Sequence, residues 1–173
     1  MKNEMVAEEI IKNLIRSAFE VRENAYAFYS HFAVGAAVLS DDGGVYTGCN
    51  IENASYPAGS CAETVAINKA VSEGARGIRA IAIVGGPEGK EDDEQASHVN
   101  DYIYPCGICR QVLSEFRGKD GTVVILAKSA DDYKLYDFSE LMVGAFTSEA
   151  LSGQADDADD SAEQEIDPDD SAE

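Results

Sequence analysis

The sequence predicts an α/β protein, a three-layer α/β/α sandwich around a mixed sheet of five strands. The chain has 173 residues, which suits one domain with one core. Its hydrophobic residues make up 45% of the chain, as in globular proteins. Helix-like and strand-like segments alternate, and helices between strands imply crossover connections and a sheet that is covered on both faces.

The first half of the chain is predicted to contain a helix, a β-hairpin and a second helix. The first helix is indicated by apolar residues at spacings of three and four. The hairpin is indicated by two apolar runs with a turn sequence of Asp and Gly between them. The second helix ends at a glycine, a common C-terminal cap. These segments are residues 7–19, 32–39, 45–49 and 61–73, with Gly74 as the cap.

The second half is predicted to alternate strands and helices around a polar loop. One strand ends at a Gly-Gly-Pro turn, and the helix after the loop opens with proline, which is favourable in a first helical turn. Two more strands and a short helix follow. The segments are a strand at 78–84, a loop at 87–104, a helix at 105–116, strands at 122–127 and 133–136, and a helix at 138–146.

The chain is strongly acidic, with 33 Asp and Glu residues against 13 Lys and Arg residues and a net charge of -20. This balance disfavours nucleic acids and anionic membranes as partners. The last residues are acidic and lack aromatic side chains, which predicts one domain at 1–151 and a disordered tail at 152–173. No apolar run is long enough to cross a bilayer, and acidic residues near the start do not fit a secretory signal. We therefore expect a cytoplasmic protein.

Three of the four cysteines have the spacing of metal ligands. Cys106 and Cys109 lie at i and i+3 in the first turn of a predicted helix, and Cys61 opens another. Helix N-termini favour thiolates, and three thiolates leave one tetrahedral position of Zn²⁺ for water, as in a catalytic site. Cys49 is either a packing residue or a fourth ligand that would close the site into a structural one.

Glu63 follows Cys61 by two residues, which places a carboxylate beside the predicted metal. A carboxylate there can take a proton from water and return it to a leaving group. Cys-x-Glu followed by Pro-Cys-x-x-Cys is a signature of zinc deaminases. We therefore expect Glu63 to be the catalytic proton carrier.

Four ordered stretches resemble the small, homotetrameric, zinc-dependent cytidine deaminases over about residues 7–146. They are YSHFAVGAA at 29–37, GCNIENASY at 48–56, CAE at 61–63 and PCGICRQ at 105–111. The resemblance implies hydrolysis of cytidine, and of 2′-deoxycytidine, to the uracil nucleoside and ammonia in pyrimidine salvage. It also implies a homotetramer that binds a small nucleoside.

The same resemblance implies roles for five further residues. Asn50 and Glu52 match the pair that hydrogen-bonds the sugar 3′-hydroxyl, and their period-2 spacing points both side chains the same way. Phe32 matches the aromatic residue that packs against the base. Ala62 matches the residue whose N–H contacts the pyrimidine carbonyl, and Phe146 resembles the aromatic residue that reaches a neighbouring subunit's site.

Three positions depart from the family pattern. Thr64 stands where the family commonly has an arginine that offsets the thiolate charge, so Arg110 or the helix dipoles must serve instead. Phe28 and Val143 replace frequent prolines. Two alternatives stay open: a deaminase of another aminated nucleoside, such as an aminopyrimidine nucleoside antibiotic, and a non-catalytic, zinc-stabilised binding module.

Overall fold

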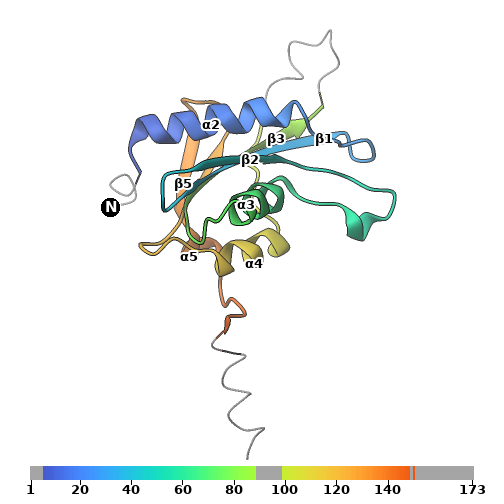
Figure 1. The fold of residues 1–173 in the computed structure, drawn as a ribbon. Helices are drawn as coiled ribbons and strands as arrows, with labels where there is room; N and C mark the ends of the chain where they lie inside the picture. Colours follow the sequence, from blue (N-terminus) through green and yellow to red (C-terminus); the bar gives the residue numbers. More distant parts are fainter. Residues whose placement is uncertain (1–5, 89–98, 149, 151–173) are drawn as a thin grey trace, which may run out of the picture.

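A computed structural model describes residues 6–88, 99–148 and 150, which form a five-stranded sheet with helices on both faces (Figure 1). The strand order is β2-β1-β3-β4-β5. Strands β3 and β4 are parallel, and the other neighbouring pairs are antiparallel, so the sheet is mixed. The strands are β1 (Phe32–Ser40), β2 (Val45–Cys49), β3 (Ile78–Pro87), β4 (Val123–Ala127) and β5 (Tyr133–Asp137).

Helices cover the sheet on opposite sides, which confirms the predicted three-layer fold class. Helix α2 lies along one face, and α3 and α4 lie against the other (Figure 1). A short helix, α5, and a 3₁₀ turn, η1, complete the described elements. The helices are α2 (Glu8–Arg22), α3 (Ala62–Ser72), α4 (Gly107–Glu115) and α5 (Phe138–Leu141), and the turn is η1 (Tyr56–Ala58).

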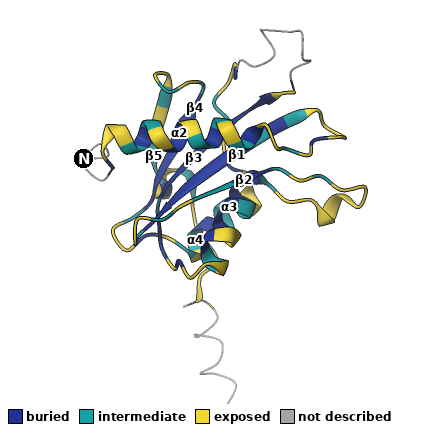
Figure 2. Cartoon of the chain, turned by 45° about the horizontal axis from the view of Figure 1, so that its top comes forward, coloured by how far each residue is buried: buried dark blue, intermediate teal, exposed yellow. Residues whose placement is uncertain are grey.

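The strands divide their side chains between two buried clusters. On β3, Ile81 and Ile83 pack in the cluster beneath α3, whereas Ala80 and Ala82 pack in the cluster beneath α2. This alternation follows from the period of two residues in a strand. The central strands are accordingly buried along almost their whole length, and α2 is exposed only on its outer face (Figure 2).

Two glycines let helices approach the sheet at backbone distance. A Cβ atom on Gly48 of β2 would lie 2.4 Å from the N atom of Ala66 and 2.6 Å from the O atom of Ala62, both in α3. A Cβ atom on Gly35 of β1 would lie 2.0 Å from the O atom of Ala18 in α2. Gly48 therefore lets the first turns of α3 pack closely against β2, and the candidate site lies at that end of the helix.

Three elements differ by three residues or more from the predicted ones. The first helix was predicted at 7–19, and α2 extends to Arg22. β3 continues beyond residue 84, because Gly85 and Gly86 stay paired with β1. The last helix was predicted at 138–146 but ends at Leu141. It starts with a capping box between Asp137 and Glu140, and Met142 then leaves the helical region with a φ of -122° and a ψ of 101°.

Some predictions fall on residues outside the described ranges. The predicted acidic tail at 152–173 lies there, as do residues 89–98 of the predicted loop. Among the described helices, none combines the length and the apolar character needed to span a membrane.

Candidate zinc centre

Three cysteine side chains converge where two helices begin. Cys61 is the N-cap residue of α3, and Cys106 is the N-cap residue of α4. Cys109 lies one turn into α4, on the same side as Cys106. The three Sγ atoms lie within 4.8 Å of one another. The spacing of cysteines in the sequence thus becomes a single cluster at two helix N-termini.

The cluster fits a zinc ion. A tetrahedral zinc with Zn–S bonds of about 2.3 Å separates its sulfur ligands by about 3.8 Å. The Sγ atom of Cys106 lies 3.9 Å from that of Cys61 and 3.6 Å from that of Cys109. Three sulfur ligands leave one tetrahedral position for a further ligand, which is the composition of a catalytic rather than a structural zinc site.

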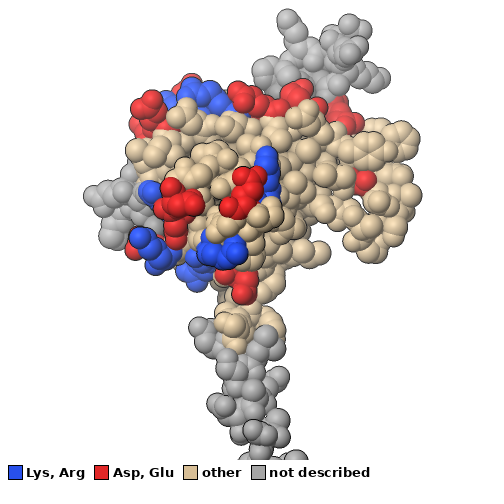
Figure 3. Space-filling model, viewed as in Figure 1, with Lys and Arg blue, Asp and Glu red and all other residues tan. Residues whose placement is uncertain are grey.

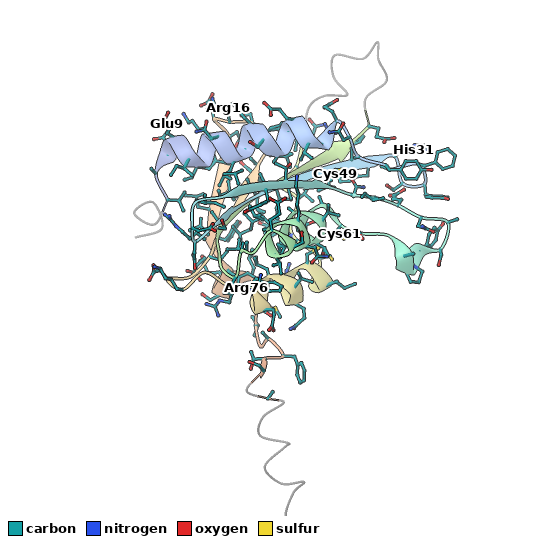
Figure 4. All side chains as sticks on the ribbon, in the orientation of Figure 1. Glu9, Arg16, His31, Cys49, Cys61 and Arg76 are labelled. Atoms are coloured by element: carbon teal, nitrogen blue, oxygen red, sulfur yellow. The ribbon has the colours of Figure 1, made fainter. Side chains whose placement is uncertain are left out.

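Cys49 is not part of this cluster. Its thiol donates a hydrogen bond to the O atom of Asn24 at 3.4 Å, and burial raises the pKa of the thiol. Figure 4 labels Cys49 and Cys61, which come from β2 and from the start of α3. In the described part of the chain, the group of possible metal ligands consists of Cys61, Cys106 and Cys109. The geometry therefore supports Cys49 as a packing residue.

A hydrogen bond between two thiols of the cluster shifts their pKa values in opposite directions. The hydrogen bond with Cys109 is the main cause that lowers the pKa of Cys61 to about 6. The same contact, together with burial, raises the pKa of Cys109. Cys61 therefore ionises before Cys109, and a metal that binds here must displace the proton from Cys109.

Glu63 is a buried carboxyl group in the first turn of α3. It is 5% exposed, and burial is the main cause that raises its pKa. The charge of Cys61 raises the pKa further, whereas a hydrogen bond with Cys109 lowers it. A carboxyl group whose pKa is raised holds a proton more readily, which suits a group that acts as general acid as well as general base.

A cavity of about 710 Å³ opens beside the cluster and collects most of the predicted substrate residues. Glu63 and two of the three cysteines form part of its wall, and the third, Cys109, is buried behind them. Phe146 is not among the residues that line this cavity, and it is 60% exposed. The predicted residues in the lining are Phe32, Asn50, Glu52, Cys61, Ala62, Glu63 and Cys106.

Two of the polar residues that line this cavity, Asn50 and Glu52, are held by backbone groups of the neighbouring segment. Asn50 donates from Nδ2 to the O atom of Phe32 at 2.9 Å and accepts at Oδ1 from the N atom of Val34 at 2.8 Å. The carboxylate of Glu52 accepts hydrogen bonds from the N atoms of Tyr29 and Ser30 at 2.8 and 3.0 Å. Both side chains are thereby fixed at the cavity wall.

Several lining residues were not predicted from the sequence. Ser30 donates its hydroxyl to Glu52 and accepts at Oγ from the N atom of Phe32 at 3.1 Å, so it connects the two. Ser30 lies within the stretch 29–37 that resembles the family, so this motif could have identified it as a residue of the site. Tyr104, with Ile103, adds a wall before the PCGICRQ stretch, where no motif pointed to it.

Arg110 and Thr64 make different contacts near the cluster. Arg110 donates from Nε to the O atom of Pro105 at 2.9 Å and from Nη1 to the O atom of Leu141 at 2.8 Å. Arg110 thus fixes the chain on either side of α4. The Oγ1 atom of Thr64 lies 3.5 Å from the Sγ atom of Cys109.

The fold and the cluster together define a zinc-binding α/β protein, and comparison with known proteins gives its family. The model of the cytidine and deoxycytidylate deaminase zinc-binding region matches residues 8–127. This match covers more than half of the chain and includes all three clustered cysteines and Glu63. The chain belongs to this family of zinc-binding deaminases.

Individual cytidine deaminases are similar in sequence to this protein over most of its chain. The chain is 41% identical over 143 residues to the cytidine deaminase of Sporosarcina psychrophila, which covers 82% of this chain and 95% of the relative. It is 44% identical over 138 residues to the cytidine deaminase of Halalkalibacterium halodurans, covering 80% and 95%.

Solved structures are similar as well. A crystal structure of cytidine deaminase from Burkholderia pseudomallei has a TM-score of 0.65 and 40% identity, covering 78% of this chain and 97% of that chain. The structure of cytidine deaminase from Mycobacterium tuberculosis has a TM-score of 0.62 and 34% identity, covering 82% and 98%. The similarity thus extends from the sheet to nearly the full length of these enzymes.

Proposed function

We propose that the chain is a zinc-dependent cytidine deaminase, which hydrolyses cytidine to uridine and ammonia. The observation that carries this proposal is the position of Glu63. Its buried carboxyl group shares one cavity with the thiol cluster and with Asn50 and Glu52. A binding module without turnover has no need of a buried carboxyl group at that point, because burying such a group costs free energy.

Nucleoside binding is assigned to four residues that line the cavity. Glu52 and Asn50 receive the sugar, since each has a polar side chain fixed by the backbone and facing the cavity. Phe32 packs against the base, and the N–H of Ala62 contacts the pyrimidine carbonyl. Ala62 is fully buried at the first position of α3, where backbone N–H groups have no partner within the helix. Together these contacts hold C4 of the base at the cluster.

Glu63 carries the protons of the reaction. When bound at the three thiolates, zinc supplies Lewis acidity, which lowers the pKa of water toward neutrality. Glu63 takes a proton from the attacking water and delivers it to N3. It then takes the remaining proton from the oxygen bonded to C4 and passes it to the departing amine. The water oxygen forms a bond to C4, the bond between C4 and the exocyclic nitrogen breaks, and ammonia leaves.

We extend the proposal to 2′-deoxycytidine. The sugar contacts assigned to Asn50 and Glu52 serve the 3′-hydroxyl, which both nucleosides carry. A cytoplasmic location and a role in pyrimidine salvage belong to the same proposal. Free thiols at Cys61, Cys106 and Cys109 support a reducing compartment, because oxidation would remove the metal ligands.

A homotetramer with sites shared between subunits completes the proposal. Four aromatic residues form a chain of exposed rings beside the cavity: Tyr26, Phe28, Tyr29 and Tyr56, with centroids 5.3–6.4 Å apart. Figure 3 shows that the end of the molecule where the loops with these aromatic residues lie carries little charge. Exposed aromatic surface of this kind is typical of protein interfaces. Light scattering coupled to size-exclusion chromatography would test the assembly.

Product analysis with a substrate panel tests the function. Zinc-loaded protein is mixed with cytidine, 2′-deoxycytidine, free cytosine and an aminopyrimidine nucleoside antibiotic, and the products are separated by chromatography. We expect uridine, deoxyuridine and ammonia from the first two. If only the antibiotic is turned over, the substrate is an aminopyrimidine nucleoside of that kind and not cytidine. Absence of any turnover by protein with bound zinc would leave the binding module as the function.

A further inference from the structure

The innermost sulfur of the cluster lies where water cannot reach it. Cys109 is 1% exposed, whereas Cys106 is exposed and Cys61 is partly exposed. A metal-bound cysteine is a thiolate, and a buried negative charge is costly unless a donor faces it. Cys106 and Cys61 can use solvent for this purpose. The Cys109 sulfur depends on a donor from the protein.

Thr64 supplies a donor at this point. It occupies the first turn of α3, three residues after Cys61, and Cys109 occupies the first turn of α4. The Thr64 Oγ1 atom lies 3.5 Å from the Cys109 Sγ atom, a hydrogen-bond distance for the large sulfur atom. A thiolate can only accept, so with metal bound the hydroxyl donates. The bond also joins the two helices that carry the ligands.

We propose that Thr64 is a positioning residue of the zinc centre, which orients Cys109 and offsets part of its charge through a hydroxyl-to-sulfur hydrogen bond. This inference rests on the proposed zinc site. It assigns the charge compensation to a neutral hydroxyl, at the position where the resemblance led us to expect a cation. The Arg110 guanidinium instead donates from Nε and Nη1 to the carbonyl oxygens of Pro105 and Leu141.

The test compares side chains of matched shape at residue 64. Thr64→Val keeps the branched shape and removes the hydroxyl, whereas Thr64→Ser keeps the hydroxyl. Ser72→Ala is the control, since it removes a hydroxyl from the same helix where that group bonds only the O atom of Lys69. Zinc dissociation constants are measured by competition with a chromophoric chelator. Because zinc is titrated without nucleoside, the result is independent of whether the chain deaminates cytidine.

We expect Thr64→Val to weaken zinc binding by about 10–100-fold, as is usual when a group that supports a metal ligand is removed. Thr64→Ser and Ser72→Ala should stay within about threefold of the parent, because both keep a hydroxyl at residue 64. Equal zinc affinity of the parent and Thr64→Val would overturn the proposal.

Cobalt substitution gives a readout that a loss of packing would not produce. A hydrogen bond lowers the energy of the sulfur lone pairs, from which the thiolate-to-cobalt charge-transfer transition starts. We therefore expect the band of Co²⁺-loaded Thr64→Val to shift to longer wavelength, with the band of Thr64→Ser unshifted. If Thr64→Val fails to fold, Thr64→Ala replaces it in both measurements. An unshifted band in the hydroxyl-free variant would contradict the hydrogen bond.

Discussion

The carboxamide of Asn50 is hydrogen-bonded at both ends to the backbone of β1, donating to the O atom of Phe32 at 2.9 Å and accepting from the N atom of Val34 at 2.8 Å. Asn50 follows the last residue of β2, so its side chain continues the pairing of the two strands. Phe32 is the first residue of β1 and lines the cavity. The residue proposed to bind the sugar thereby also positions the residue proposed to pack against the base.

Asn50→Asp should weaken both stability and substrate binding. The substitution puts a carboxylate oxygen in place of the amide donor, 2.9 Å from the carbonyl oxygen of Phe32. Loss of the donor at a half-buried site should lower the free energy of unfolding by about 1–3 kcal/mol. The KM for cytidine should rise. Chemical denaturation and steady-state kinetics check both effects, with Asn24→Asp as a control that adds the same charge at an exposed position. Equal stability of the two variants would contradict the role of Asn50.

Ser30→Ala should move the acid limb of the pH profile to higher pH. The hydrogen bond from the Ser30 hydroxyl is the main cause that lowers the pKa of Glu52. A carboxylate with a lowered pKa is lost as the pH falls through that pKa, so removal of the hydroxyl raises the pKa and the loss begins at higher pH. Profiles of kcat/KM for Ser30→Ala and Ser30→Thr measure the displacement. Superimposable acid limbs would show that Ser30 does not act through Glu52.

Ser30→Ala should weaken the use of cytidine without changing the binding of free cytosine. If Glu52 binds the sugar, kcat/KM for cytidine should fall about three- to tenfold at neutral pH, a modest loss because the pair is exposed to solvent. The inhibition constant of free cytosine, which has no sugar, should stay unchanged when cytosine competes with cytidine. An equal weakening of cytidine turnover and of cytosine inhibition would place the effect on the base rather than on the sugar.

Gly48→Ala should displace α3 and with it the zinc ligand Cys61. The added Cβ atom would lie 2.4 Å from the N atom of Ala66, which is a backbone atom that cannot rotate away. Overpacking of this kind should lower the free energy of unfolding by about 1–3 kcal/mol and weaken zinc binding. Gly107→Ala is the matched control, because its Cβ atom meets nothing within 4 Å. Chelator competition and denaturation compare the two, and equal zinc affinity would contradict the importance of this contact.

The parts of the site that lie close together in sequence could be predicted from it. Cys106 and Cys109 share a helical turn, so their common orientation follows from helix geometry alone. Asn50 and Glu52 are two residues apart on extended backbone, and both line the cavity as expected. The sheet was predictable for a similar reason, because strands buried on both faces are continuously apolar.

Contacts between distant segments could not be predicted. Ser30 and Glu52 are 22 residues apart, and their hydrogen bond depends on how the segment before β1 folds against the end of β2. Thr64 and Cys109 are 45 residues apart and meet only because α3 and α4 begin at the same place. Sequence patterns describe one element at a time, whereas these pairs depend on how two elements pack.

The ends of α5 and β3 could not be predicted from the local sequence either. The segment after Leu141 has the composition of a helix, but Met142 is extended and Gly144 has a φ of 74°, so the chain turns away. At the end of β3, Gly85 and Gly86 suggested a turn. They remain in the strand because Val34 and Ala33 of β1 pair with them. At the end of β3, pairing with the neighbouring strand thus outweighed the local preference of the two glycines.

The role of Glu63 is tested most directly by comparing the zinc-loaded parent with Glu63→Gln in a cytidine absorbance assay. Glutamine preserves the size of the side chain and removes its capacity to carry protons. We predict rapid loss of cytidine absorbance with the parent and a rate about 10²–10⁴-fold lower with Glu63→Gln. Zinc content measured by mass spectrometry should be equal in both proteins. Near-parental turnover by zinc-loaded Glu63→Gln would show that Glu63 does not move the protons.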